Sequence, residues 1–178
     1  MAKNKKSKKQ KYPKVFKTER AWENFKEEYA DVIDLREAIF KRYPVHSWKD
    51  LADKVFSQYI RLKGANRSGV CVCITCWKHF YWKKIQNGHY RSRWDNKYRF
   101  DEINCHPQCE RCNIHLSGNY RNYHKYMVNK YWEEVEEKIR NDKEAVKYKQ
   151  EWYEEHILEW FAYIEKKEAI IEKRGEKK

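Results

Sequence analysis

Two Cys-x-x-Cys pairs stand near the middle of the chain, Cys73 with Cys76 and Cys109 with Cys112. This spacing lets one tight turn direct two thiolates at a single ion, and two such turns complete a tetrahedral zinc site. Four free buried thiols are the plain alternative. A redox role is disfavoured, because the sequence around the two pairs lacks the β-α-β pattern that usually surrounds a redox pair. We therefore predict that these four cysteines bind a structural zinc ion.

The segment between the two pairs is longer than a zinc site alone requires. It has 32 residues, whereas an ordinary zinc ribbon separates its pairs by roughly 15–20 residues. The two remaining cysteines are Cys71 and Cys105. We expect both to be packing thiols, because the single residue between Cys71 and Cys73 makes a poor metal-binding turn. The extra length indicates that the insertion, which contains His89, has a function other than zinc binding.

His89 lies among basic and aromatic residues, and the only acidic residue between positions 83 and 99 is Asp95. Basic and aromatic side chains mixed in this way suit a nucleic-acid backbone, with rings available for stacking. A histidine with a pKa near neutral can take a proton from water at physiological pH, although a single histidine is often only a polar residue. The residues that we predict to contact DNA are Lys83, Lys84, Arg91, Arg93, Lys97 and Arg99.

Two asparagines accompany His89 and the second cysteine pair. Asn104 stands five residues before Cys109, and Asn113 directly follows Cys112. Because a zinc knuckle is rigid, the residue after it has a fixed direction, and Asn113 can offer its amide oxygen to a hard cation such as Mg²⁺ or be only a turn former. Such an ion would polarise a phosphoryl oxygen and stabilise the leaving 3′ oxygen while His89 activates water.

This ordered set of His89, Asn104 and Asn113, framed by the two cysteine pairs, resembles the HNH (ββα-metal, His-Me finger) nuclease motif, and the arrangement is similar to that of phage endonuclease VII. The phage NinG (Rap) recombination family is a closer match. This resemblance covers roughly residues 50–165 and rests on the segments "FSQYIRLKG", "CITC", "GHYRSR", "YRFDEINCHPQCERCN" and "LSGN".

The resemblance implies a structure-specific DNA endonuclease that uses Mg²⁺ or Mn²⁺ and acts on branched recombination intermediates such as Holliday junctions and D-loops. It also implies a homodimer, because symmetric cleavage of a four-way junction needs two active sites. In this resemblance His89 is the general base, Asn113 is a ligand of the catalytic ion, and Asn104 holds the loop that orients His89.

One position departs from the pattern that the resemblance implies. Many HNH enzymes carry an Asp immediately before the histidine, where it binds the catalytic metal, but the residue here is Gly88. Another ligand must then serve, or substrate phosphate must hold the ion. Asp101 and His115 are the nearest candidates in the sequence.

The charge of the chain points to an anionic partner. The formal net charge is +13, and residues 1–17 carry eight Lys and no acidic residue, a pattern that favours nucleic acid, although such an arm can also serve solubility alone. We interpret residues 1–17 as a basic disordered arm. No signal peptide and no run of 18 apolar residues is visible, so we expect no membrane segment and a reducing cytoplasm, the host's if a phage encodes the chain.

The surrounding elements are mostly helical, as low counts of Gly and Pro suggest. Apolar spacing predicts a helix over residues 19–43 and another from Ser47, where "SWKD" offers a cap, up to Gly64. "VCVCITC" predicts a β-rich entry into the metal site, and residues 77–108 predict short strands and loops. Helix returns from about Gly118, as one segment or two, and a long helix is predicted at about residues 143–173.

The predicted fold class is α+β and mainly helical, with a small zinc-stapled ββα-metal core flanked by N- and C-terminal helices. Its expected parts are residues 1–17 (arm), 18–66 (helical), 67–120 (nuclease core) and 121–178 (helical). Two other functions fit part of the pattern. A non-catalytic zinc-containing module that binds nucleic acid explains the charge and the cysteines, and an interaction scaffold explains the helices, but neither explains the inserted His89 and its asparagines.

Overall fold

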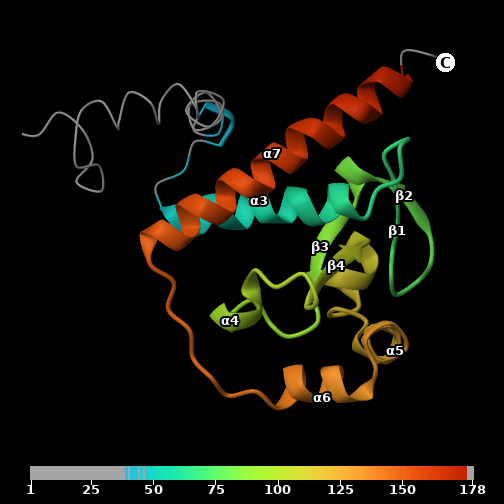
Figure 1. Cartoon of the computed structure of the whole chain (residues 1–178). Coiled ribbons are helices and arrows are strands. Elements are labelled where there is room, and N and C mark those ends of the chain that lie inside the picture. Colours follow the sequence, from blue (N-terminus) through green and yellow to red (C-terminus); the bar gives the residue numbers. More distant parts are fainter. Residues whose placement is uncertain (1–38, 40, 44, 46, 176–178) are drawn as a thin grey trace, which may run out of the picture. The chain divides into compact units, whose positions relative to one another are not determined.

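The computed structural model describes residues 39, 41–43, 45 and 47–175. The predicted arm at residues 1–17 and most of the helix predicted at residues 19–43 lie outside this range. Figure 1 shows the elements in chain order. They are α3 (Trp48–Lys63), β1 (Val70–Val72), β2 (His79–Tyr81), the 3₁₀ turn η1 (Trp82–Lys84), β3 (Gln86–His89), α4 (Asn96–Arg99), β4 (Cys105–Gln108), the π-helical turn η2 (Arg111–His115), α5 (Tyr120–Tyr131), α6 (Glu133–Asn141) and α7 (Gln150–Gly175).

The helix predicted from Ser47 is confirmed as α3. The Ser47 hydroxyl accepts a hydrogen bond from the Asp50 backbone N–H (3.1 Å), which satisfies one of the donors left open at a helix start. At the other end the Gly64 N–H donates to the Ile60 carbonyl (3.0 Å). Both predicted boundaries of this helix are therefore correct.

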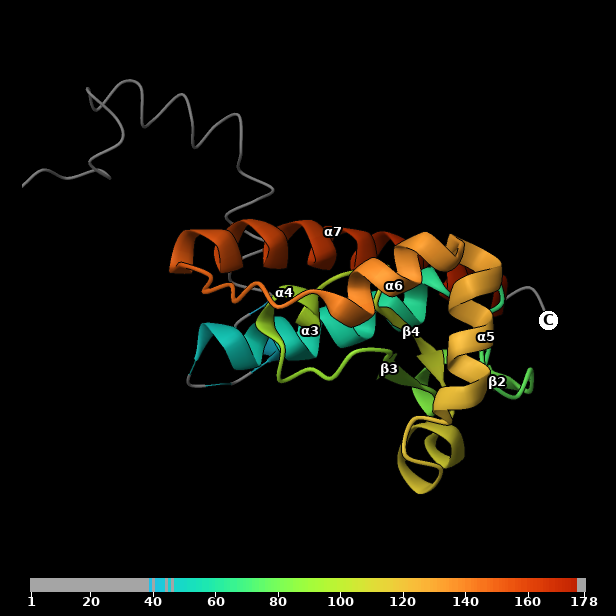
Figure 2. The same cartoon turned by 90° about the horizontal axis from the view of Figure 1, so that it is seen from below.

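Helix α7 lies along α3, and the two form the main aromatic core (Figures 1 and 2). The Phe56 ring of α3 packs against Trp160 of α7, with 4.7 Å between ring centroids, and edge-on against Phe100 at 5.7 Å. Within α7, the side chains of Ile157, Trp160, Phe161 and Ile164 are buried. This packing is what fixes α3 beside the centre of the molecule.

The last helix begins later than the sequence predicts, because residues 143–149 are not helical. The segment is instead bound to the central loop. Lys97 forms ion pairs with Asp142 and Glu144, and the Tyr148 hydroxyl donates to the Lys97 carbonyl (3.3 Å). These contacts hold the chain extended before α7 starts.

Two small antiparallel sheets form the centre. β1 pairs with β2, and β3 pairs with β4 in a register that places Gln86 opposite Gln108 and His89 opposite Cys105. Helix α5 packs against the second sheet through the buried Tyr123, whose hydroxyl donates to the Gly88 carbonyl (2.9 Å) or the Asn104 carbonyl (3.1 Å). The β3–β4 sheet is thus enclosed by α3 on one side and α5 on the other.

The fold is mainly helical α+β, as predicted, and the helical region after Gly118 consists of two helices, α5 and α6, separated at Trp132. The described residues from Tyr43 to Gly175 belong to one compact unit. In the part of the chain that the structure describes, no helix has the length and apolar character that crossing a bilayer demands.

Candidate nuclease centre

The four cysteines of the two pairs meet at one point. The sulfur atoms of Cys73, Cys76, Cys109 and Cys112 all lie within 4.8 Å of one another, and the Cys76 and Cys109 sulfurs are 3.7 Å apart. Tetrahedral zinc with Zn–S bonds of about 2.3 Å requires sulfur–sulfur separations of about 3.8 Å. The cluster therefore fits a zinc ion of the predicted kind.

Local hydrogen bonds prepare one of these thiols for an ion. Burial raises the pKa of the Cys73 thiol, but the Cys109 backbone N–H (3.3 Å) and the Thr75 hydroxyl (3.4 Å) contact its sulfur, and the balance lowers this pKa to about 6. Cys71 and Cys105 lie outside the cluster and are buried. Burial raises the pKa of Cys71 to about 11, as expected of a packing thiol.

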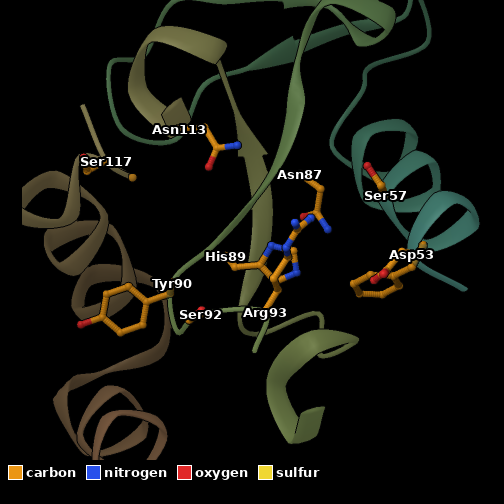
Figure 3. A pocket seen from close by; sticks show the side chains of 11 residues that line it. Asp53, Ser57, Asn87, His89, Tyr90, Ser92, Arg93, Asn113 and Ser117 are labelled. Carbon is orange, nitrogen blue, oxygen red and sulfur yellow. The ribbon is translucent and has the colours of Figure 1, made fainter. Parts of the chain in front are cut away.

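A cavity of about 470 Å³ opens beside the β3 strand. His89 at the end of β3 and Asn113 in η2 both line it, so the structure brings together two of the three residues of the predicted catalytic set (Figure 3). The third, Asn104, is fully buried and does not line the cavity. The other lining residues are Asp53, Phe56, Ser57, Asn87, Tyr90, Ser92, Arg93, Ser117 and Gly118.

The ring of His89 is held in one tautomer. Its Nε2 lies 3.1 Å from the Arg99 carbonyl oxygen, and because a carbonyl can only accept, Nε2 must carry the hydrogen. The lone pair is then on Nδ1. Burial lowers the pKa of His89, so the imidazole is neutral at physiological pH. A neutral ring with a fixed donor and an available lone pair is suited to accept a proton.

Asn104 ties the two ends of the loop that follows β3. Its amide oxygen accepts from the Arg91 N–H (2.7 Å), and its amide nitrogen donates to the carbonyls of Arg91 (2.9 Å) and Tyr98 (2.9 Å). Tyr98 directly precedes Arg99, whose carbonyl orients His89. The position of Asn104 is therefore that of a loop clamp behind the His89 ring.

Asn113 is oriented by the zinc-binding segment and by β3. Its backbone N–H donates to the Cys109 carbonyl (2.8 Å), and its side-chain nitrogen donates to the Gln86 amide oxygen (2.7 Å). Among the described residues no donor contacts the Asn113 amide oxygen. The carboxamide thus keeps an oxygen acceptor for a ligand in the cavity.

The structure explains why position 88 has no side chain. A Cβ atom built on Gly88 would lie 2.8 Å from the Gln108 Cβ and closer still to the Gln108 amide oxygen. Gln108 cannot easily move aside, because its amide nitrogen donates to the Gly118 carbonyl (2.6 Å) and the Thr75 hydroxyl (3.2 Å). An Asp at this position would collide with a side chain that joins β4 to the cysteine cluster.

The polar cavity residues that the sequence reasoning missed include Asp53 and Ser57 of α3 and Asn87 of β3. The Asn87 amide oxygen is buried and has no hydrogen-bond partner. Asp53 forms a bidentate ion pair with Arg99. Asn87 could have been found from the two-residue alternation of a strand, which places it on the same face as His89, but nothing in the local sequence marks the α3 residues.

A family model described as "Bacteriophage Lambda NinG protein" matches residues 1–169. The chain belongs to the NinG family. No curated protein and no solved structure matches it. The match covers almost the whole chain and includes every residue that lines the cavity.

The basic residues predicted to contact DNA fall into two groups in this NinG protein. Arg91, Lys97 and Arg99 are engaged within the chain, since they pair with Asp95, with Asp142 and Glu144, and with Asp53, respectively. The other three residues are exposed. Arg93 lines the cavity, and Lys83 and Lys84 belong to η1. A phosphate can reach the second group without breaking an ion pair.

The two weaker metal-ligand candidates do not line the cavity. The Asp101 carboxylate accepts from the Ile103 N–H (2.7 Å) and closes the turn before β4. His115 is exposed at the end of η2. Asp53 and Asn87, by contrast, line the cavity.

Proposed function

We propose that this NinG protein is a divalent-metal-dependent DNA endonuclease of the HNH type, and that it acts on branched recombination intermediates. One observation carries the proposal. His89, with a fixed tautomer and an Nδ1 lone pair, lines the same cavity as Asn113, whose amide oxygen has no protein donor. A scaffold or a plain binding module has no need for this pairing, whereas hydrolysis needs a base and a ligand for a cation side by side.

In this proposal β3, β4 and η2 form the ββα-metal core. Cys73 and Cys76 follow β1, Cys109 precedes η2, and Cys112 lies within η2. A structural zinc there would hold η2 against β3 and so fix Asn113 relative to His89. The ion would act as scaffold and take no part in the reaction.

His89 would act as the general base. With Nε2–H bound to the Arg99 carbonyl, Nδ1 can take a proton from a water that attacks the phosphorus. The Asn104 clamp would keep the loop closed so that the ring holds this direction. The exposed Arg93 beside it would bind a phosphate oxygen of the substrate.

The cavity also offers oxygen ligands for a hard divalent cation. Asn113, Asn87 and Asp53 would hold the ion, because carboxylate and amide oxygens are the ligands that Mg²⁺ and Mn²⁺ prefer. The unpartnered Asn87 oxygen supports this assignment, since a buried acceptor without a donor is costly unless a ligand meets it. Such an ion, when bound, would supply Lewis-acid stabilisation of charge on the phosphate.

Branched recombination intermediates are the proposed substrate for two reasons. Membership of the NinG family suggests a role in phage recombination, and the chain resembles junction-cleaving enzymes. Paired cleavage of a four-way junction would need two copies of the chain, so we expect a homodimer on DNA. Shape and phosphate placement would select the substrate.

The test is an incubation of purified protein with labelled four-way junctions and linear duplex, in Mg²⁺, in Mn²⁺ and in chelator. We expect cleavage of junctions that requires the divalent ion and is lost, with binding retained, in His89→Ala and in Asn113→Ala. His115→Ala is the matched control, because this exposed residue lies outside the cavity. Nicking that survives in His89→Ala would falsify the role of this residue, and binding without cleavage in any divalent metal would establish the non-catalytic module instead.

A further inference from the structure

Beside the cavity, a tight turn displays one aromatic ring to solvent. The Asp95 N–H donates to the Ser92 carbonyl (3.0 Å), which closes a turn with Arg93 and Trp94 at its two central positions. Ser92 and Arg93 line the cavity, while the Trp94 side chain is 84% exposed. No aromatic partner contacts this ring among the described residues.

This turn is held from several sides. The Asn104 clamp fixes Arg91 just before it, and Arg91 forms an ion pair with Asp95 on the far side (2.7 Å). The Arg99 guanidinium donates to the Arg93 carbonyl at the centre of the turn (2.7 Å). Trp94 is therefore exposed on a constrained backbone, and binding through its ring would cost little chain ordering.

The fold does not need the Trp94 ring, because a side chain with so much exposed surface contributes little to a core. By contrast, Trp82 and Trp160 are buried. An exposed indole beside an exposed guanidinium is the pair of groups that proteins use on single-stranded nucleic acid, the ring for a base and the cation for a phosphate. The adjacent Arg93 favours such an anionic ligand.

We propose that Trp94 is a stacking platform for an unpaired or end-exposed nucleobase at a DNA branch point. This inference rests on the proposed nuclease function and adds a basis for its substrate choice. In a continuous duplex each base is covered on both faces by its neighbours. A base face is open only at a branch, a flap or a strand end, so a fixed ring beside the cavity selects those structures while Arg93 binds the neighbouring phosphate.

The experiment measures binding in chelator, so that cleavage plays no part. Full-length protein is titrated into a splayed junction and into a relaxed, covalently closed duplex circle that has no strand ends, each with a fluorescent adenine analogue at the branch-point position or within the duplex. The variants are Trp94→Ala and Trp94→Phe, with Trp132→Ala as the control, since Trp132 is 78% exposed but does not line the cavity. Zinc content and melting temperature confirm that each variant is folded.

We expect Trp94→Ala to bind the junction roughly 10-fold more weakly, within the range that loss of one base–aromatic stack gives. The duplex affinity and the salt dependence should remain unchanged, because no charge is removed. Trp94→Phe should keep most of the affinity, and Trp132→Ala all of it. The analogue's quenching at the branch point should be lost only in Trp94→Ala.

Unchanged junction affinity in Trp94→Ala, or an equal loss on duplex and junction, would overturn the proposal and assign the ring to another partner such as a protein. Failure of the nuclease function is a separate result. It would appear as absence of cleavage by the unmodified protein in Mg²⁺ and Mn²⁺, whatever Trp94 does to binding.

Discussion

Replacing Asn104 by alanine should destabilise the fold and loosen the loop that carries Arg93 and orients His89. Asn104 is fully buried and makes three hydrogen bonds, one accepted from the Arg91 N–H and two donated to the carbonyls of Arg91 and Tyr98. Alanine removes all three partners at once. It leaves the Arg91 N–H and the Arg91 carbonyl without these bonds in the interior, while the Tyr98 carbonyl still accepts from the Asp101 N–H (3.4 Å).

The size of the effect follows from these bonds. A net contribution of about 1 kcal/mol for each hydrogen bond gives a loss of about 3 kcal/mol, and any unpaired group that water cannot reach adds to it. For a unit of this size, such a loss lowers the melting temperature by roughly 10 °C. The loop should open locally as well, because the clamp joins its two ends.

The comparison of Asn104→Ala with Asn104→Asp makes the test specific. Aspartate keeps the acceptor for the Arg91 N–H and nearly the same volume, but it directs a carboxylate oxygen at two carbonyls. It should therefore destabilise the protein at least as much as alanine does. Asn113→Ala, which removes one side-chain bond at a half-buried site, should cost about 1 kcal/mol.

Two measurements check this reasoning. Chemical denaturation of the zinc-loaded protein gives the free energy of unfolding, and amide hydrogen exchange of residues 91–104 reports opening of the loop. The reasoning is refuted if Asn104→Asp is as stable as the unchanged protein, because the donors assigned to the side chain would then be wrong. A loss below about 1 kcal/mol in Asn104→Ala would refute the clamp itself.

Three further predictions concern the zinc site, position 88 and acid stability. Cys109→Ser, or chelation of zinc, should abolish cooperative folding of the centre, since a structural zinc supplies folding energy; zinc release and near-ultraviolet circular dichroism measure it. Gly88→Ala should cost about 1–3 kcal/mol through overpacking against Gln108, measured by denaturation, and an unchanged stability would mean that Gln108 moves freely. Burial lowers the pKa of His106 to about 3, so the unfolded chain takes up a proton that the folded chain refuses. His106 should then contribute a fall in stability of roughly 1.4 kcal/mol per pH unit below about 6.5, and His106→Gln should remove this contribution from the measured slope.

The parts of this molecule that depend on short-range rules could be predicted from the sequence. Ser47 caps α3 because its hydroxyl reaches a backbone N–H three residues ahead, and that contact needs no tertiary structure. The cysteine pairs are similar, since spacing alone brings two thiols together in each turn. The helix predicted from residue 143 was placed too early for the opposite reason, because the contacts of Lys97 with Asp142 and Glu144 join distant segments.

Contacts between distant segments also limit what the sequence predicts about the basic residues at positions 83–99. Composition indicates that residues 83–99 are positively charged, but it does not tell which charges are free to meet a ligand. Folding brings Asp53 to Arg99 and Asp142 to Lys97, and these two cations become structural, whereas Arg93 on the tight turn stays exposed. The charge pattern supports an anionic partner, and only the packed structure separates candidate contacts from internal ion pairs.

Position 88 shows how tertiary packing can change the interpretation of a sequence pattern. The resemblance to HNH enzymes makes a glycine there look like a lost metal ligand, but the register pairs Gly88 with His106, and the side chain of Gln108, two residues further along β4, lies against position 88. Gln108 in turn connects the strand to Thr75 of the cysteine cluster and to Gly118. A side chain at position 88 would disrupt this connection, so the glycine is required by packing. In the proposed function, the oxygen ligands then come from other positions that line the same cavity, Asp53 of α3 and Asn87 of β3.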